Sequence, residues 1–170
     1  LWCLMMRIFD SVSDILFFLE KKNNLNLFQV EKIKFSELKN WNFQNKTGDL
    51  THKSSNFFKI IGADITTNWG EKKKWSQPII MQDEVGILGV LLKYIDDIPH
   101  FLLQVKFEPG NINGAQLSPT IQATKSNYSK VHGGSNVKYL KYFKDFSKKR
   151  VIVDQLQSEQ ESRFLKKRKR

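Results

Sequence analysis

The feature that most constrains this fold is a pair of alternating segments on either side of a Glu-Pro-Gly-Asn turn. Before the turn, Gln104, Lys106 and Glu108 alternate with Leu103, Val105 and Phe107. After it, the polar residues Gln116, Ser118, Thr120, Gln122 and Thr124 alternate with apolar ones. A period of two places successive side chains on opposite faces of a β-strand. We therefore predict two neighbouring strands, each with one apolar and one polar face.

The polar face of the second segment carries hydrogen-bonding side chains and no charge. A strand face in contact with solvent is usually richer in Lys and Glu, so a neutral row favours a pocket for a polyhydroxylated ligand. An exposed hairpin face is the alternative interpretation. We predict that the two polar faces line one cleft.

Composition limits the partners of the chain. Its 170 residues suit one domain with a real core. The net charge of +11 is concentrated at residues 72–74, 148–150 and 166–170, which favours anionic partners such as phosphates or nucleic acid. No apolar run is long enough to cross a membrane. The single cysteine, Cys3, fits a reducing compartment, so we expect a cytoplasmic protein without membrane association.

Strands outnumber helices in the predicted element order. Apolar residues at helical spacing predict a helix that begins at Ser11 and Asp14 and ends at Asn23 and Asn24. Further strands are expected at residues 57–67, 79–82, 86–95, 99–107 and 151–156, a short helix at 139–146, an exposed turn at 68–74 and a connection at 40–56. Runs of strands without βαβ alternation predict an α+β fold.

Several strings in this order resemble the nucleoside-diphosphate-hexose 2,3-dehydratase family. They are Gln-x-Lys-x-Glu-Pro-Gly-Asn from residue 104, Gln-Leu-Ser-Pro-Thr-x-Gln-Ala-Thr from residue 116, and Ser-Asn-Tyr from residue 126. Residues 75–80, 86–89, 157–160, 163–164 and 167–168 fit the same family in the same order. The resemblance extends from about Phe57 to the C-terminus.

The resemblance implies a Nudix-like mixed β-sheet flanked by helices, and a family whose members carry two similar halves in tandem. Residues 1–50 would form an N-terminal helical and connecting region, and residues 51–170 one sugar-nucleotide-binding half. The implied reaction is dehydration of a dTDP-4-keto-6-deoxyhexose in 2,6-dideoxysugar biosynthesis, without a cofactor. The C4 ketone acidifies the C3 proton, a base removes it, and the C2 hydroxyl leaves as water.

Four residues are candidates for the chemistry. Glu108 or Glu159 would be the base, and Lys106 and His132 would stabilise charge or protonate the leaving group. Lys106 and Glu108 project to the same face of a regular strand, where a simple ion pair is the alternative. No metal site is expected, because the three histidines are far apart and lack ligand spacing.

A second set of residues would bind the substrate. Trp75 would stack on the nucleobase, and Arg163, Lys167 and Arg168 would hold the diphosphate. The remaining candidates are polar residues of the matching strings: Gln82, Gln104, Asn111, Gln116, Ser118, Thr120, Gln122, Thr124, Ser126, Asn127 and Tyr128.

Two other functions remain open from the sequence. The chain could be a non-catalytic half that binds the sugar nucleotide or dimerises, or a basic nucleic-acid-binding module with steep salt dependence. We expect the substrate, and either a second copy or a missing second half, as partners rather than nucleic acid. A lone half should expose an apolar surface.

Overall fold

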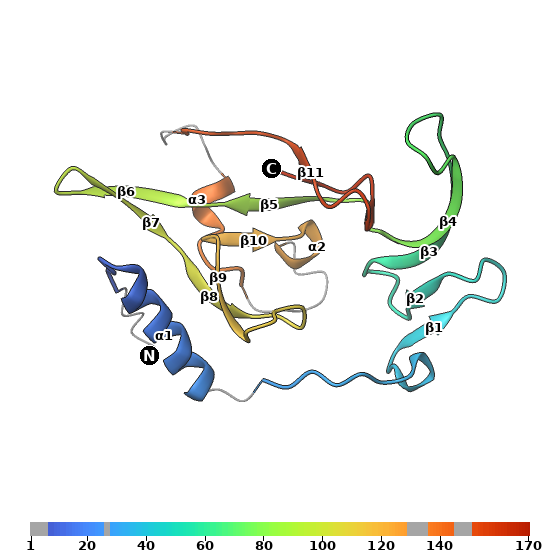
Figure 1. Cartoon of the computed structure of the whole chain (residues 1–170), viewed down its shortest axis with the longest axis horizontal. Coiled ribbons are helices and arrows are strands. Elements are labelled where there is room, and N and C mark those ends of the chain that lie inside the picture. The colour runs from blue at the N-terminus through green and yellow to red at the C-terminus, as the bar shows by residue number, and fades with distance from the viewer. Residues whose placement is uncertain (1–6, 26–27, 129–135, 145–150) are drawn as a thin grey trace.

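The computed structural model describes residues 7–25, 28–128, 136–144 and 151–170, and it has the predicted α+β character. His132 lies outside the described residues. Figure 1 shows two groups of strands side by side, with helix α1 beneath the group that contains β5 to β10. No helix in the described part of the chain is long and apolar enough to cross a membrane.

The elements in chain order are α1 (Val12–Leu25), η1 (Phe35–Glu37), β1 (Trp41–Phe43), β2 (Leu50–His52), β3 (Lys59–Thr66), β4 (Lys74–Met81), β5 (Val85–Gly89), β6 (Leu91–Ile95), β7 (Ile98–Leu102), β8 (Gln104–Phe107), β9 (Ala115–Ser118), β10 (Ile121–Ala123), α2 (Lys125–Tyr128), α3 (Lys141–Lys144), β11 (Gln157–Ser158), β12 (Phe164–Leu165) and β13 (Arg168–Lys169).

The first sheet has the strand order β1-β2-β3-β4-β12. Its centre is the long antiparallel pair β3 and β4, in which Ile60 lies opposite Ile80. The predicted strand at 57–67 is confirmed as β3, but β4 begins at Lys74, inside the predicted turn. The predicted connection at 40–56 was wrong in part, because β1 and β2 lie within it. The signal was the aromatic residue Trp41, whose ring packs 5.0 Å from that of Phe58.

The predicted strands at 86–95 and 99–107 are each present, but each is divided by one residue into two shorter strands. Val90 separates β5 from β6, and Leu103 separates β7 from β8. The neutral segment is likewise divided into β9 and β10. Because β6 pairs with β7, β8 with β9, and β10 with β5, each of these bent strands pairs with both of the others.

Thr120 lies where the three bent strands meet. Its side chain is fully buried, and its hydroxyl accepts a hydrogen bond from the Leu91 N–H at 2.8 Å and donates one to the Leu102 carbonyl. The Gln104 amide donates to the carbonyl of Thr120 itself. Pro119 precedes it and has no N–H for a strand ladder, which explains why the predicted single strand is broken here.

Helix α1 begins as predicted after Ser11, and it continues through Asn23 and Asn24 to Leu25. The Ser11 hydroxyl accepts the Asp14 N–H at 3.1 Å, and the Ser11 hydroxyl donates to the Asp14 carboxylate at 2.7 Å. At the other end, Asn23 donates to the Asn113 carbonyl and accepts the Ala115 N–H. Gly114 has φ +70°, and a Cβ there would lie 2.6 Å from the Asn23 oxygen. The turn between β8 and β9 therefore holds the helix against the sheet.

The C-terminal segment was predicted least well. The strand expected at 151–156 is wrong, because these residues form no regular structure. Instead, β12 joins β4 in the first sheet, and β13 joins β5 in the second sheet, whose order is β10-β5-β13-β11. Residues 164–169 thus contribute one short strand to each sheet. The predicted helix at 139–146 is present as α3, within the described residues.

We expect Thr120→Val to lower the free energy of unfolding by roughly 2–4 kcal/mol, because it leaves the buried Leu91 N–H and Leu102 carbonyl without partners. Chemical denaturation measures the change. Thr66→Val is the matched control, because Thr66 is exposed at the end of β3. Equal stability of the two variants would contradict a structural role for the Thr120 hydroxyl.

Candidate functional site

The candidate site lies where two chain segments cross from the first sheet to the second, side by side and parallel. Leu165 lies opposite Met81 before the crossing, and Arg168 lies opposite Val85 after it. Residues 166–167 on one segment therefore face residues 82–84 on the other. Three residues on the β4–β5 connection thus face two on the C-terminal segment. The longer connection forms a tight turn, in which the Glu84 N–H donates to the Gln82 carbonyl at 2.9 Å. Such bulges re-aim side chains and are frequent beside active sites.

Glu84 is held in this turn by several donors. Its carboxylate accepts the Gln82 amide at 2.6 Å, the Ser126 N–H at 2.8 Å and the Ser126 hydroxyl at 3.1 Å. The Nζ of Lys167 lies 3.8 Å from the same carboxylate. The carboxylate therefore joins the β4–β5 connection, the start of α2 and the crossing C-terminal segment.

Lys167 is the most unusual side chain of the site. The residue is 2% exposed, and its Nζ is buried without a hydrogen-bond partner among the described residues. Burial lowers the pKa of the Lys167 amine, while Glu84 and then Glu159 oppose the shift by attraction. A buried amine of lowered pKa has a neutral form available to accept a proton.

A polar row extends from this centre across the bent strands. Gln104 pairs with Ser118, and Lys106 pairs with Gln116, so their side chains share one face of the β8–β9 ladder. The Ser118 hydroxyl donates to the Gln122 side chain at 3.4 Å. Two residues further, the Thr124 and Ser126 hydroxyls are 3.1 Å apart, and Ser126 reaches Glu84. We call these residues the polar row: Lys106, Gln116, Gln104, Ser118, Gln122, Thr124, Ser126, Glu84 and Lys167.

Some predicted site residues are engaged within the fold. Thr120 is fully buried at the strand junction, where its hydroxyl bonds to the backbone of Leu91 and Leu102 and not to the polar row. The Asn111 amide donates to the carbonyls of Lys106 and Gly114 and thereby fixes the β8–β9 turn. Glu159 forms an ion pair with Lys169. Lys106 and Glu108 lie 3.8 Å apart, and the Glu108 side chain is 49% exposed.

Other predicted residues make no described contact with the polar row. Trp75 donates to the Gln77 side chain on β4, seven residues and about 23 Å of strand from Gln82. Arg163, Arg168 and Asn127 are exposed, and the Tyr128 ring lies 5.9 Å from the Lys144 amine. Among the described residues, no group of three or more His, Cys, Asp or Glu side chains could hold a metal ion.

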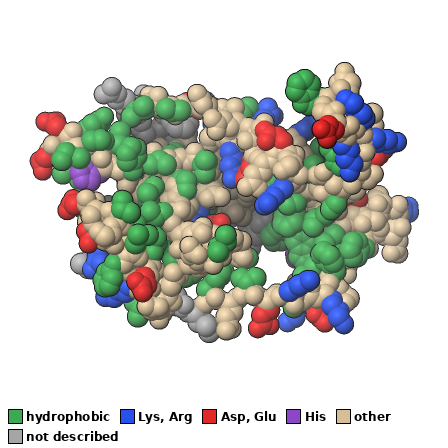
Figure 2. Space-filling model, in the orientation of Figure 1, with side chains coloured by type: hydrophobic (Ala, Val, Ile, Leu, Met, Phe, Trp, Pro, Cys, Tyr) green, Lys and Arg blue, Asp and Glu red, His purple; other side chains and the backbone are tan. Residues whose placement is uncertain are grey.

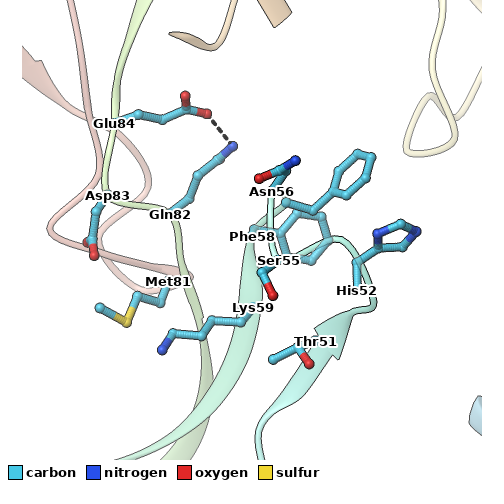
Figure 3. A pocket seen from close by; sticks show the side chains of 11 residues that line it. Thr51, His52, Ser55, Asn56, Phe58, Lys59, Met81, Gln82, Asp83 and Glu84 are labelled. Carbon is cyan, nitrogen blue, oxygen red and sulfur yellow. Dashed lines mark hydrogen bonds between the residues drawn. The ribbon is translucent and has the colours of Figure 1, made fainter. Parts of the chain in front are cut away.

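A cavity of about 380 Å³ opens next to Glu84. Figure 3 shows Asn56 and Phe58 on one side of it and Gln82 and Glu84 on the other. The lining residues are Thr51, His52, Ser55, Asn56, Phe57, Phe58, Lys59, Met81, Gln82, Asp83 and Glu84. Sequence reasoning found Gln82 but missed Glu84 and the residues of the β2–β3 turn. The available signal for Glu84 was its alternation with Gln82 directly before a strand.

The comparisons with known proteins agree with the resemblance seen in the sequence. A family model described as NDP-hexose 2,3-dehydratase matches residues 12–170, and the chain belongs to this family. It is 48% identical over 162 residues to a dTDP-4-dehydro-6-deoxy-alpha-D-glucopyranose 2,3-dehydratase of Amycolatopsis orientalis. The chain is also 49% identical to an enzyme of the same name from Saccharopolyspora spinosa and 43% identical to one from Streptomyces violaceoruber.

The matches cover most of this chain but only part of each relative. They include 92%, 85% and 97% of the chain, and 34%, 30% and 37% of the three relatives. The chain thus spans about a third of the length of the relatives that it matches.

We expect Lys167→Met to leave the unfolding free energy unchanged within about 1 kcal/mol, rather than to cost the 3–5 kcal/mol typical of breaking a buried ion pair. Methionine fills a similar volume without a buried charge, and Glu84 keeps its donors from Gln82 and Ser126. Lys169→Met is the control on the same segment and should be more destabilising, because it removes the partner of Glu159. Denaturation curves compare the variants.

The stability difference between the parent and Lys167→Met should also depend on pH. The unfolded chain holds the Lys167 proton up to about pH 10.5, whereas the folded chain releases it earlier. Between the lowered pKa and 10.5 the parent should therefore gain stability relative to the variant. A constant difference from pH 7 to 10.5 would show that the amine is not desolvated.

Proposed function

We propose that this chain contributes the reacting centre of a sugar-nucleotide 2,3-dehydratase that acts on a dTDP-4-keto-6-deoxyhexose. The observation that carries the proposal is the buried Lys167 amine beside Glu84, at the end of a row of neutral polar side chains. Among the described residues this amine has an ion pair with Glu84 but no hydrogen-bond partner. Family membership supports it, and the names of the three relatives supply the substrate class.

The residues present fit the chemistry of this elimination. The neutral Lys167 amine takes the C3 proton, and the electrons of the C–H bond form the enolate across C3 and C4. The amides of Gln104 and Gln122 are donors for the enolate oxygen and the sugar hydroxyls. The enolate electrons then form the C2–C3 double bond, and the C2 hydroxyl takes the proton from the Lys167 ammonium and leaves as water. Glu84 acts as a positioning residue for Lys167 and Ser126.

We propose Glu108 and Glu159, the bases predicted from the sequence, as alternatives to Lys167. Glu108 has Lys106 beside it, but its side chain is half exposed, and desolvation is what strengthens such groups. Glu159 already has Lys169 as its partner. His132 stays a prediction outside the described residues. We further propose a Nudix-like arrangement, a cytoplasmic location, and Trp75, Arg163 and Arg168 as nucleotide contacts beyond the polar row.

A specific observation supports the alternative of a non-catalytic binding half. The chain spans only about a third of the relatives' length, so groups that complete the site could lie elsewhere in the whole protein. The C-terminal basic run gives the nucleic-acid alternative less support than its charge alone implies. Lys167, Lys169 and Arg170 of the C-terminal basic run have acidic neighbours in Glu84, Glu159 and Asp154.

We expect Lys167→Met to slow exchange of the C3 proton of dTDP-4-keto-6-deoxyglucose with deuterium by roughly 10²–10⁴-fold, the usual contribution of a general base. Proton NMR in D₂O measures this step without requiring the full elimination. Glu84→Gln should slow exchange by less, because the amide still reaches Ser126. Lys93→Met, on the exposed face of β6, is the matched control.

The same assay ranks the other candidates. Exchange that is lost in Glu108→Gln but retained in Lys167→Met would transfer the role of base to Glu108. Tight binding of dTDP by the parent without any exchange would support the non-catalytic half. Calorimetry with dTDP provides this second readout.

The surface supports an apolar partner for this chain. It exposes 14217 Å², whereas a compact monomer of 19.9 kDa exposes roughly 8,700 Å². Figure 2 shows hydrophobic side chains across much of the visible face. On the β6–β7 hairpin, Tyr94, Ile98 and Phe101 are each at least 60% exposed, and Phe17 on α1 is 69% exposed. Patches of this kind usually mark interfaces.

We therefore expect the isolated chain to self-associate at micromolar concentration, and Phe101→Lys to shift it toward the monomer. A charge placed on a buried apolar interface must be desolvated, which weakens association. Sedimentation velocity measures the shift. Phe43→Lys on the edge strand β1 is the control for a general gain in charge. A parent that stays monomeric would contradict the proposed partner surface.

A further inference from the structure

The cavity beside Glu84 has two chemically different walls. One wall comes from the β2–β3 turn and carries the rings of His52, Phe57 and Phe58. The other comes from the β4–β5 connection and carries Gln82, Asp83 and Glu84. Its volume of about 380 Å³ lies within the roughly 300–1,000 Å³ of small-molecule sites. The mechanism above uses only the polar wall.

The aromatic wall is preorganised by ring contacts. Trp41 lies behind it, with its ring centroid 5.0 Å from that of Phe58 and 5.4 Å from that of His52. Phe57 packs edge-on against His52 at 4.5 Å. The His52 ring is fixed in turn, because its Nδ1 accepts the Ser54 N–H at 3.2 Å. These side chains present a rigid apolar surface. Lys59 also lines the cavity, and its amine lies 3.8 Å from the Asp49 carboxylate.

The polar wall meets the proposed reacting centre. Glu84 lines the cavity, and its carboxylate lies 3.8 Å from the Lys167 amine, which is not itself part of the cavity lining. Asp83 and Glu84 make this wall acidic, which disfavours phosphate groups and favours hydroxyls, since carboxylates accept their hydrogen bonds. Asn56 and Gln82 add amides that both donate and accept.

The positions of the ring carbons then determine which substituent of the sugar faces the aromatic wall. In a pyranose, C5 lies across the ring from C2. If the C2–C3 edge faces Glu84 and Lys167, the substituent on C5 points away from them. In a 6-deoxyhexose that substituent is a methyl group, whereas in an ordinary hexose it is a hydroxymethyl group.

We infer that the cavity binds the hexose ring of the substrate, and that Phe57 and Phe58 select the 6-methyl group over a 6-hydroxymethyl group. The inference rests on the proposed function, because that function locates the C2–C3 edge. A hydrophobic pocket rejects an added hydroxyl by at most about 10²-fold, so we expect a preference of roughly 10–100-fold. The selected ligand is thus an uncharged deoxysugar ring rather than the thymine base.

Calorimetry with three non-reacting ligands tests this inference: dTDP-6-deoxyglucose, dTDP-glucose and dTDP. The parent chain should bind the 6-deoxy sugar nucleotide roughly 10–100-fold more tightly than dTDP-glucose. Phe57→Ala and Phe58→Leu should reduce this ratio and leave the affinity for dTDP unchanged. Phe57 is 44% exposed at the cavity, so its truncation is compatible with folding. Phe43→Ala, an exposed aromatic outside the cavity, should change none of the affinities.

Each other outcome overturns a distinct statement. A parent that binds both sugar nucleotides equally, or variants that retain the preference, would overturn the methyl selection while the proposed function stands. An equal loss of dTDP affinity in Phe57→Ala and Phe58→Leu would assign the cavity to the thymine base. A parent that binds none of the three ligands would overturn the proposed function of this chain.

Discussion

The side-by-side crossing of two segments between the sheets is the constraint on which the rest of this structure depends. Residues 81–86 carry the chain from the first sheet into the second, and residues 165–169 repeat the path in parallel. Paired strands share their backbone hydrogen bonds, so the crossing ties the sheets through main-chain contacts rather than through a large apolar core. Because one segment has an extra residue, Glu84 is turned toward Lys167 at the point where both sheets end. The proposed reacting centre is therefore a product of the topology.

The bent strands give this centre its polar surroundings. A straight strand from residue 116 to residue 124 could pair with only one neighbour on each side along its whole length. The break at Pro119 and Thr120 lets its first part pair with β8 and its second part with β5. The polar side chains of both parts thereby reach the same row, and Ser126 follows directly at the start of α2. A hydroxyl at the bend replaces the ladder hydrogen bonds that the break removes.

The sequence predicted what depends on local alternation and capping. These are the α+β class, the start of helix α1 at Ser11, and the shared polar face of Gln104, Lys106, Gln116 and Ser118. The sequence could not predict contacts between distant segments. Residues 164–169 form strands only because β4 and β5 offer them partners, and a basic run has no alternation that marks a strand. The alternation of Glu84 with Gln82 marked it only locally, since its partners Ser126 and Lys167 are far away in the chain.

The cations near the crossing differ in how closely they contact their carboxylate partners. Arg170 lowers the pKa of Asp154 by its hydrogen bonds to that carboxylate, as an ordinary exposed ion pair does. Lys169 has Glu159 in close contact. Lys167, between the same strands, has its carboxylate at 3.8 Å and no hydrogen bond among the described residues. Stability alone would favour an apolar side chain at such a position. We propose that this buried amine, 3.8 Å from a carboxylate that lines the cavity, meets a further group only when substrate is bound.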